Sequence, residues 1–243
     1  IAGLSYTICA VLTLVLEAPL AQLYDEGRMN EVKTHLRYSL KYFLAITIPF
    51  IFGATILAEP VLRVFSTVEI AREGHSVVPI LALAVAFMGI HNIIAFILLL
   101  TKKTKIMALM WIMAASLNLG LNILVVPWIG ILGAAITTLI AYALVLVLAS
   151  YYSFKEFQFN IDWLFIIKSF IASAIMSLVV WLVAPKGNLD TILTVVAGAA
   201  IYGGILILLR GFSREEVSFF WGLLRRSASA AGSDNIENNN PPL

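Results

Sequence analysis

The chain is a succession of long apolar runs separated by short polar connections. Seven of these runs approach or reach the roughly 20 residues that a helix needs to cross a bilayer. The predicted spans are residues 1–18, 38–58, 77–100, 106–126, 131–153, 162–183 and 190–209. The pattern therefore predicts an all-α, polytopic membrane protein.

The pattern changes after the seventh run. Ser213 and Glu216 have capping-box spacing, and the apolar residues that follow them fall on one helical face. Residues 211–226 are therefore predicted to form an amphipathic helix at the membrane interface. Residues 227–243 have no apolar period and are predicted to be a disordered tail.

The connection between the fourth and fifth runs holds the most informative polar residues. Asn118 and Asn122 are four residues apart, so they share one helical face and must point toward protein or water. Pro127 is predicted to stop the helix. Gly130 and Gly133 then allow a tight turn and close packing of the next helix. We expect a tightly packed helical hairpin here.

A second proline lies inside a predicted span. Pro49 removes one backbone hydrogen bond near the middle of residues 38–58, so we expect a kink in that helix. Such a kink serves either a moving helix or a curved packing surface, and the sequence leaves both interpretations open.

Composition agrees with the membrane assignment. Hydrophobic residues make up 61% of the chain and charged residues 12%, far less charge than a soluble domain carries. A net charge of +2 is too small to indicate nucleic-acid binding. The single cysteine, Cys9, excludes an internal disulfide and a cysteine-based metal cluster.

The distribution of the basic residues predicts the topology. The connections after the first, third and fifth spans, together with the tail, carry twelve Lys and Arg, including Lys102, Lys103 and Lys105, whereas the other connections carry three. Basic residues gather on the cytoplasmic side. We therefore expect the first helix to enter from outside and the C-terminus to be cytoplasmic.

Two ionisable residues within the spans are candidates for function. His91 could gate protons, but the helix around it holds no carboxylate, which favours a neutral packing histidine. Lys168 could contact an anionic lipid phosphate. It lies less than two turns from its helix start, so snorkelling to the cytoplasmic interface is the favoured interpretation.

The hairpin also carries a family resemblance. Its sequence NLGLNILVVPWIGILGAAITT resembles a signature of polysaccharide flippases, the O-antigen and repeat-unit exporters of the multidrug/oligosaccharidyl-lipid/polysaccharide exporter superfamily. The upstream pieces YDEGR, SLKY, the Pro49 helix and LAEPVL are similar to that family in the same order. The resemblance extends over about residues 16–142.

The resemblance implies a two-lobe transporter of twelve or fourteen helices, of which this chain is the C-terminal lobe. Ile1 already lies in an apolar run without an initiator Met, so we expect the sequence to start partway through a larger protein whose N-terminal lobe is missing here. The implied function is flipping of a lipid-linked oligosaccharide across the cytoplasmic membrane, without a cofactor. Alternating access would come from rocking of the lobes, with H⁺ or Na⁺ as possible coupling ions.

Two other function classes make different demands on the sequence. A membrane enzyme needs a carboxylate pair, a nucleophile with a base, or a metal constellation, and the three histidines, His35, His75 and His91, fall at different sides or depths of the predicted topology. A cation-coupled multidrug antiporter is expected to carry a buried carboxylate, and none lies in the middle of a predicted span. The missing lobe could hold one, so the antiporter stays open as the alternative.

Overall fold

The computed structural model describes residues 20–65, 71, 74–183 and 187–212. The predicted first helix, the tail, and all of the predicted amphipathic helix except Gly211 and Phe212 lie outside these residues. The polytopic all-α prediction is confirmed. Six of the described helices are long and apolar enough to cross a membrane, and the described residues contain no strand. The six are α2 (Met29–Ile56), α5 (Val77–Leu100), α6 (Thr104–Ile129), α7 (Ile131–Glu156), α8 (Trp163–Val183) and α9 (Asn188–Leu208), and the short helix α3 (Ala58–Phe65) follows α2.

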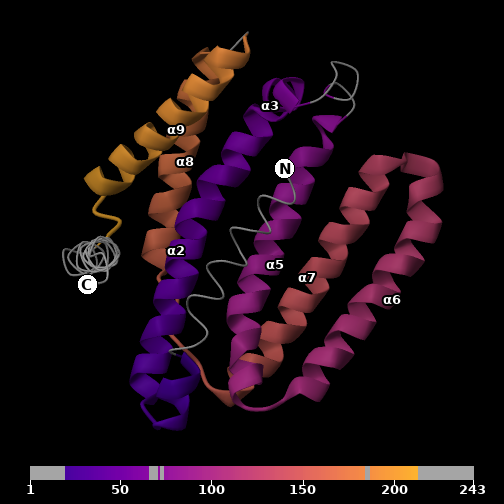
Figure 1. Ribbon diagram of the computed structural model, residues 1–243, viewed down its shortest axis with the longest axis vertical. Coiled ribbons are helices and arrows are strands. Elements are labelled where there is room, and N and C mark those ends of the chain that lie inside the picture. Colours follow the sequence, from indigo (N-terminus) through magenta and orange to yellow (C-terminus); the bar gives the residue numbers. More distant parts are fainter. Residues whose placement is uncertain (1–19, 66–70, 72–73, 184–186, 213–243) are drawn as a thin grey trace, which may run out of the picture.

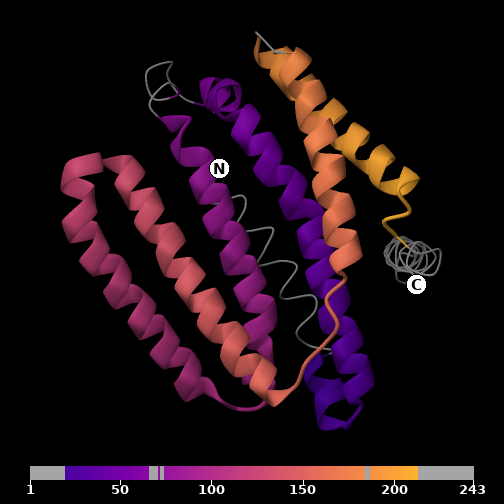
Figure 2. The ribbon, with the colours of Figure 1, turned by 180° about the vertical axis from the view of Figure 1, so that it is seen from behind.

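The six long helices stand side by side in an order that differs from their order in the chain. Figures 1 and 2 show α9, α8, α2, α5, α7 and α6 in succession across the bundle, and each of these helices contacts the next. Helix α5 is therefore covered on both sides, by α2 and by α7. The pair α8 and α9 reaches the rest of the bundle mainly through α2.

Helix α2 begins at Met29 and not near residue 38, where the sequence pattern placed the start. Its first turns look polar by composition, but Val32, Leu36 and Leu40 recur every four residues and are buried. They pack with Ile94 and Ile97 of α5 in one apolar core. Because one face of these turns has a core to cover, the helix extends through a segment that is otherwise charged.

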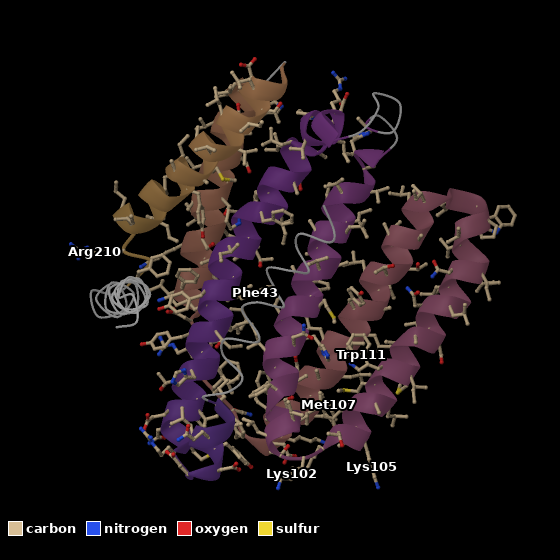
Figure 3. The ribbon with its side chains drawn as sticks, viewed as in Figure 1. Phe43, Lys102, Lys105, Met107, Trp111 and Arg210 are labelled. Carbon is tan, nitrogen blue, oxygen red and sulfur yellow. The ribbon has the colours of Figure 1, made fainter. Side chains whose placement is uncertain are left out.

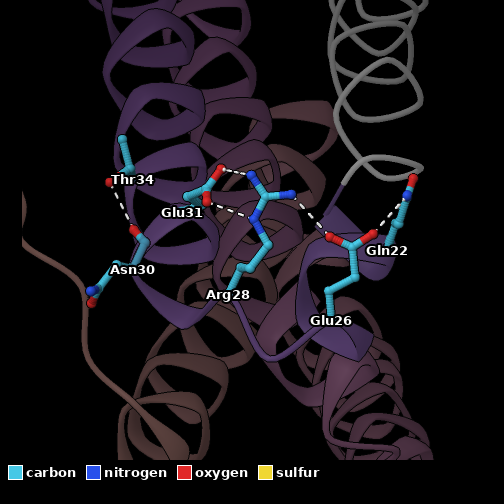
Figure 4. A network of polar contacts seen from close by, with 6 residues as sticks. All are labelled: Gln22, Glu26, Arg28, Asn30, Glu31 and Thr34. Carbon is cyan, nitrogen blue, oxygen red and sulfur yellow. Dashed lines mark hydrogen bonds and ion pairs between the residues drawn. The ribbon is translucent and has the colours of Figure 1, made fainter.

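The turn before α2 is held by exposed polar contacts (Figure 4). Gly27 has φ +72°, a left-handed conformation that glycine adopts without a steric penalty. The Arg28 guanidinium then donates to the carboxylate of Glu31 at 2.7 Å and to that of Glu26 at 2.9 Å. Exposed pairs of this kind contribute about 0–1 kcal/mol each, so they fix the local turn more than they stabilise the fold.

Pro127 does not stop α6, which contradicts the sequence prediction. The helix continues through Pro127 to Ile129, and the amide of Gly130 still donates to the Val126 carbonyl at 2.8 Å. A proline removes its own amide hydrogen but leaves the following amides free to bond. The turn comes at Gly130, whose φ of +65° lies in the left-handed region.

A glycine allows the two central helices to come close. Gly89 of α5 faces the ring of Phe43 of α2, which is buried between the helices (Figure 3). A Cβ atom at Gly89 would lie 2.1 Å from Cζ of Phe43, far inside any allowed contact. The α2–α5 packing therefore depends on the absence of a side chain at this position.

Candidate functional site

An apolar groove of about 640 Å³ lies between α2, α8 and α9. Among its lining residues, only Thr191, Thr194 and Tyr202 carry polar side-chain groups, and none is charged. One wall comes from residues 45–54 of α2, including Pro49, and from Leu57 just beyond its end. The opposite wall comes from α9, and Met176 and Val180 contribute from α8. Such a lining suits a hydrocarbon chain and offers little to a sugar.

Pro49 explains a hydrogen bond that crosses this region. In a regular helix the amide of residue 49 would donate to the carbonyl of Ala45, and proline has no amide hydrogen to give. The hydroxyl of Tyr202 in α9 donates to the Ala45 carbonyl instead, at 2.8 Å. Since that hydrogen is used, the hydroxyl of Ser169 in α8 is the donor in the 2.8 Å contact between Ser169 and Tyr202. The Ala45 carbonyl that Pro49 leaves without an amide donor thus links α2 to α9, and through Ser169 to α8.

Small residues let α8 and α9 pack closely. Ser169, Ser173 and Ser177 recur every four residues along α8 and are all buried, as expected for a face in close helix contact. On α9, a Cβ atom at Gly198 would lie 3.2 Å from Cγ2 of Val180. The groove is thus bounded by helices in close contact with one another.

A charged cluster lies one helical turn from the groove. The side chain of Lys41 is 5% exposed, and its Nζ lies 3.3 Å from Oδ2 of Asp162. Arg37, one turn earlier on α2, reaches the same oxygen at 3.5 Å. We refer to Arg37, Lys41 and Asp162 as the cationic cluster.

Sequence reasoning missed Lys41 as a buried charge. Lys41 lies at the start of the predicted span 38–58, and the count of basic residues places it in the connection before that span. A signal was nevertheless present in the sequence. Val32, Leu36 and Leu40 recur every four residues and are buried, so one apolar helical face continues through this segment. Arg37 and Lys41 are also four residues apart, which places both on one face.

Asp162 combines two roles at the start of α8. Its Oδ1 accepts a hydrogen bond from the amide of Phe165 at 3.1 Å and so caps the N-terminus of α8. Partial burial raises the pKa of Asp162. The bond from Phe165 and the charges of Lys41 and Arg37 outweigh that effect and hold the pKa below its ordinary value. Asp162 is therefore an anion at neutral pH.

Two aromatic rings lie close to the Lys41 ammonium group. Its Nζ lies 4.9 Å from the ring centre of Phe165 and 5.6 Å from that of Phe212. The ring of Phe212 also stacks with Tyr42, with a centroid separation of 6.2 Å. A cation over aromatic faces remains stabilised where water is scarce, which suits a buried lysine.

Lys168 lies at the same end of α8. Its Nζ donates to the carbonyl of Arg210, just beyond the end of α9, at 3.1 Å. Among the described residues it forms no ion pair. The side chain of Arg210 itself extends away from the bundle (Figure 3). Lys168 therefore complements the carbonyl end of α9.

The predicted hairpin residues form a separate polar ladder. The Nδ2 of Asn122 donates to Oδ1 of Asn118 at 2.9 Å, and the buried Thr137 hydroxyl of α7 donates to Oδ1 of Asn122 at 2.7 Å. Gly133 lies against Val125, where a Cβ atom would come within 3.2 Å of Cγ1. Both amides thus face a neighbouring helix or each other.

His91 lies apart from these groups. Its ring is buried at 2% exposure and meets Trp111 of α6 edge to face, with ring centres 5.3 Å apart (Figure 3 labels Trp111). The Nδ1 atom of this ring is buried and has no hydrogen-bond partner among the described residues. Because α2 stands between α5 and α8 in the bundle (Figure 1), the structure does not bring His91 and Lys168 into one site.

The chain is similar to known membrane proteins in both sequence and fold. A family model described as MatE matches residues 1–124, just over half of the chain. The probable flippase AglR of Haloferax volcanii is 25% identical over 207 residues, which cover 82% of this chain and 43% of that protein. The solved structure of the lipid II flippase MurJ in an inward closed conformation matches with a TM-score of 0.71 and 24% identity, over 85% of this chain and 44% of that one. The chain thus spans less than half the length of the relatives it matches.

Proposed function

This chain belongs to the MatE family, and from that premise we propose that it is the C-terminal lobe of a flippase for lipid-linked oligosaccharides. Support comes from its similarity to proteins named as flippases and from the share of their length that it covers. The substrate would be a polyprenyl-linked glycan, and the N-terminal lobe of the same protein would complete the transport pathway.

The apolar groove between α2, α8 and α9 is the observation that carries this proposal. A flippase must move a polar headgroup while the long chain of the same lipid stays in hydrocarbon. The groove offers an aliphatic and aromatic surface for such a chain along membrane-spanning helices. A transporter of small soluble molecules has no evident use for a wall of this kind.

The mechanism that we propose divides the substrate between two environments. The sugars cross in a hydrated cavity between the lobes, and the lipid chain follows the groove. Rocking of the lobes opens the cavity to each side in turn. The twelve basic residues mark the cytoplasmic side, where the substrate enters, and H⁺ or Na⁺ remains a candidate coupling ion without a cofactor.

The experiment that tests the proposal narrows the groove without touching helix packing. Ala199 lines the groove and is exposed, whereas the neighbouring Ala197 is exposed but outside the lining. In the full-length protein, Ala199→Trp should strongly reduce surface glycan in a strain that lacks the native copy, because the indole occupies the space of the chain. Ala197→Trp is the matched control and should export normally.

Protein levels are matched by immunoblot in this comparison. Equal export by the two variants would remove the groove from the transport path. Loss of drug resistance with normal glycan export would instead support the multidrug antiporter alternative.

A further inference from the structure

Four lysines lie together at one end of the bundle, away from the groove. Lys102 and Lys103 form the turn between α5 and α6, Lys105 lies in the first turn of α6, and Lys155 lies in the last turn of α7. We refer to these four residues as the lysine patch. We propose that the lysine patch binds the headgroup of an anionic phospholipid of the surrounding membrane. This lipid is distinct from a transported lipid, so the inference does not depend on the proposed function.

An ion pair brings the parts of the lysine patch together. The Nζ of Lys103 lies 2.5 Å from Oε1 of Glu156, although the two residues are 53 positions apart in the chain. This contact holds the α5–α6 turn against the last turn of α7. Next to it, Leu98, Met110 and Ala149 come from the same three helices and form one buried apolar cluster. The lysine patch is therefore supported by packed helices.

The lysine patch carries more positive charge than its ion pair neutralises. Among the described residues, Glu156 is the one carboxylate paired with it, so four cations and one anion leave a net charge of +3. The side chains of Lys102 and Lys105 form no ion pair and no hydrogen bond within the described part of the chain. Figure 3 shows both side chains directed away from the ends of the helices. Both ammonium groups are therefore free to meet an anion.

Two tyrosines indicate the depth of the lysine patch in the membrane. Tyr151 and Tyr152 lie one turn before Lys155 on α7, and Tyr151 is exposed. The Nζ of Lys155 lies 4.1 Å from the ring centre of Tyr151 and 6.0 Å from that of Tyr152. Tyrosine is enriched where hydrocarbon meets headgroups. The cation–π contacts orient the ammonium group without neutralising its charge, so Lys155 is held at the level of the lipid phosphates.

The backbone at Lys102 supplies an independent observation. Its φ of +58° lies in the left-handed region, which glycine adopts freely and a lysine adopts at a cost. Lys102 follows Thr101, the C-cap of α5, and the next amide donates to the Leu98 carbonyl at 2.8 Å, as at a helix end that glycine usually closes. The side chain of Lys102 has no ion pair within the described residues to offset this strain. An anionic headgroup would offset it.

The lysine patch is too far from the groove to serve a lipid chain bound there. The groove lies among α2, α8 and α9, and Val78 is its one lining residue from α5. Val78 is at the start of α5, about 36 Å along the helix from Lys102. The count of basic residues predicts that the lysine patch faces the cytoplasm, where the membrane surface is negative because of its anionic phospholipids. Phospholipids around the bundle can reach it directly.

The test titrates short-chain phosphatidylglycerol into the detergent-solubilised full-length protein and follows the melting temperature. Short-chain phosphatidylcholine and inorganic phosphate are the comparison probes. We expect phosphatidylglycerol to stabilise the protein at the lowest concentration. Lys102→Gln, Lys105→Gln and Lys155→Gln should each weaken its apparent affinity about fivefold, which corresponds to about 1 kcal/mol for a lysine at an anionic surface. Lys33→Gln is the matched control, because it removes a cation of α2 outside the lysine patch, and it should leave this affinity unchanged.

Lys102→Gly separates lipid binding from backbone strain. Glycine adopts the left-handed conformation without a steric penalty, so in the absence of anionic lipid this variant should melt at a higher temperature than the unmodified protein. Phosphatidylglycerol should raise the melting temperature of the unmodified protein more than that of the variant, which narrows or reverses the difference. A lysine that only complements the carbonyl end of α5 predicts a difference that phosphatidylglycerol does not change.

Several results would overturn the proposal. Equal stabilisation by phosphatidylcholine would show that the negative charge of the headgroup is not recognised, and equal stabilisation by inorganic phosphate would show that no lipid is needed. Unchanged affinity in the three glutamine variants of the lysine patch would exclude it as the site. An equal loss of affinity in Lys33→Gln would reduce the effect to the net charge of the protein. None of these results bears on which lipid is transported.

Discussion

At the scale of single residues, the most informative group is the one that joins three helices through Ala45, Pro49 and Tyr202. The missing amide of Pro49 leaves a carbonyl free, and a hydroxyl from a helix far along the chain occupies it at 2.8 Å. An unpaired acceptor in hydrocarbon costs several kcal/mol. The sequence shows the proline, and nothing in it identifies the hydroxyl that compensates for it.

The first prediction concerns this hydrogen bond. Tyr202→Phe should lower the free energy of unfolding by about 1–2 kcal/mol, because the Ala45 carbonyl and the Ser169 hydroxyl both lose a buried partner. In a Pro49→Ala background the restored amide can pair with Ala45, so the same substitution should cost measurably less. Equilibrium unfolding of the unmodified protein, the two single variants and the double variant gives the coupling energy between positions 49 and 202. Strictly additive changes in the free energy of unfolding would contradict this explanation.

Other residues show how far sequence reasoning reaches at this scale. The four-residue spacing of Asn118 and Asn122 predicts that both share one face, and the structure bonds them to each other and to Thr137. Their role in transport stays a prediction. Lys41 was missed because its partner Asp162 lies on a distant helix, and a pairing between segments far apart in the chain leaves no local pattern.

At the scale of elements, the apolar runs located the described spans well, and the errors lie at their ends. Helix α2 starts at Met29 because a buried face continues into charged sequence, and α6 ends at Ile129 because Pro127 disturbs only its own bond. Both errors have one cause. The hydropathy of a segment does not show whether a neighbouring helix stands ready to cover it.

The second prediction tests the contact between the central helices. Gly89→Ala places a methyl group within 2.1 Å of the Phe43 ring atom Cζ, so the two helices must separate or the ring must leave its position. We expect a loss of about 1–3 kcal/mol, the usual cost of overpacking a core. Gly53→Ala is the control, since a Cβ there meets nothing within 4 Å.

The melting temperatures of the two alanine variants in the same detergent give the comparison. Phe43→Leu, combined with Gly89→Ala, should recover part of the loss by removing ring atoms. A Gly89→Ala protein as stable as Gly53→Ala would show that the helices pack less closely than described.

At the scale of the whole molecule, the six described spans and the MatE match place the chain among multi-pass membrane proteins of a transporter family. Its orientation rests on the distribution of Lys and Arg alone. The count of basic residues in the sequence predicts this orientation. The groove between α2, α8 and α9 could not be predicted in the same way, because it depends on the order of the helices in space, which no local pattern reveals.

The third prediction concerns that orientation. In a Cys9→Ser background, Ile129→Cys at the α6–α7 turn should react with a membrane-impermeant thiol reagent in intact cells, and Thr104→Cys should react only after lysis. Both positions are exposed in the structure. The reverse labelling pattern would invert the topology and move the cationic cluster to the outer side.

The most direct test of the central claim is a flipping measurement with purified protein. The full-length protein is reconstituted in vesicles that contain a fluorescent polyprenyl diphosphate oligosaccharide, and the fraction of headgroups reached by an impermeant quencher is followed in time. We expect translocation by the unmodified protein and by Ala197→Trp, and by Ala199→Trp little more than in empty vesicles. Failure of the unmodified protein to move this lipid, or undiminished transport by Ala199→Trp, would contradict the account.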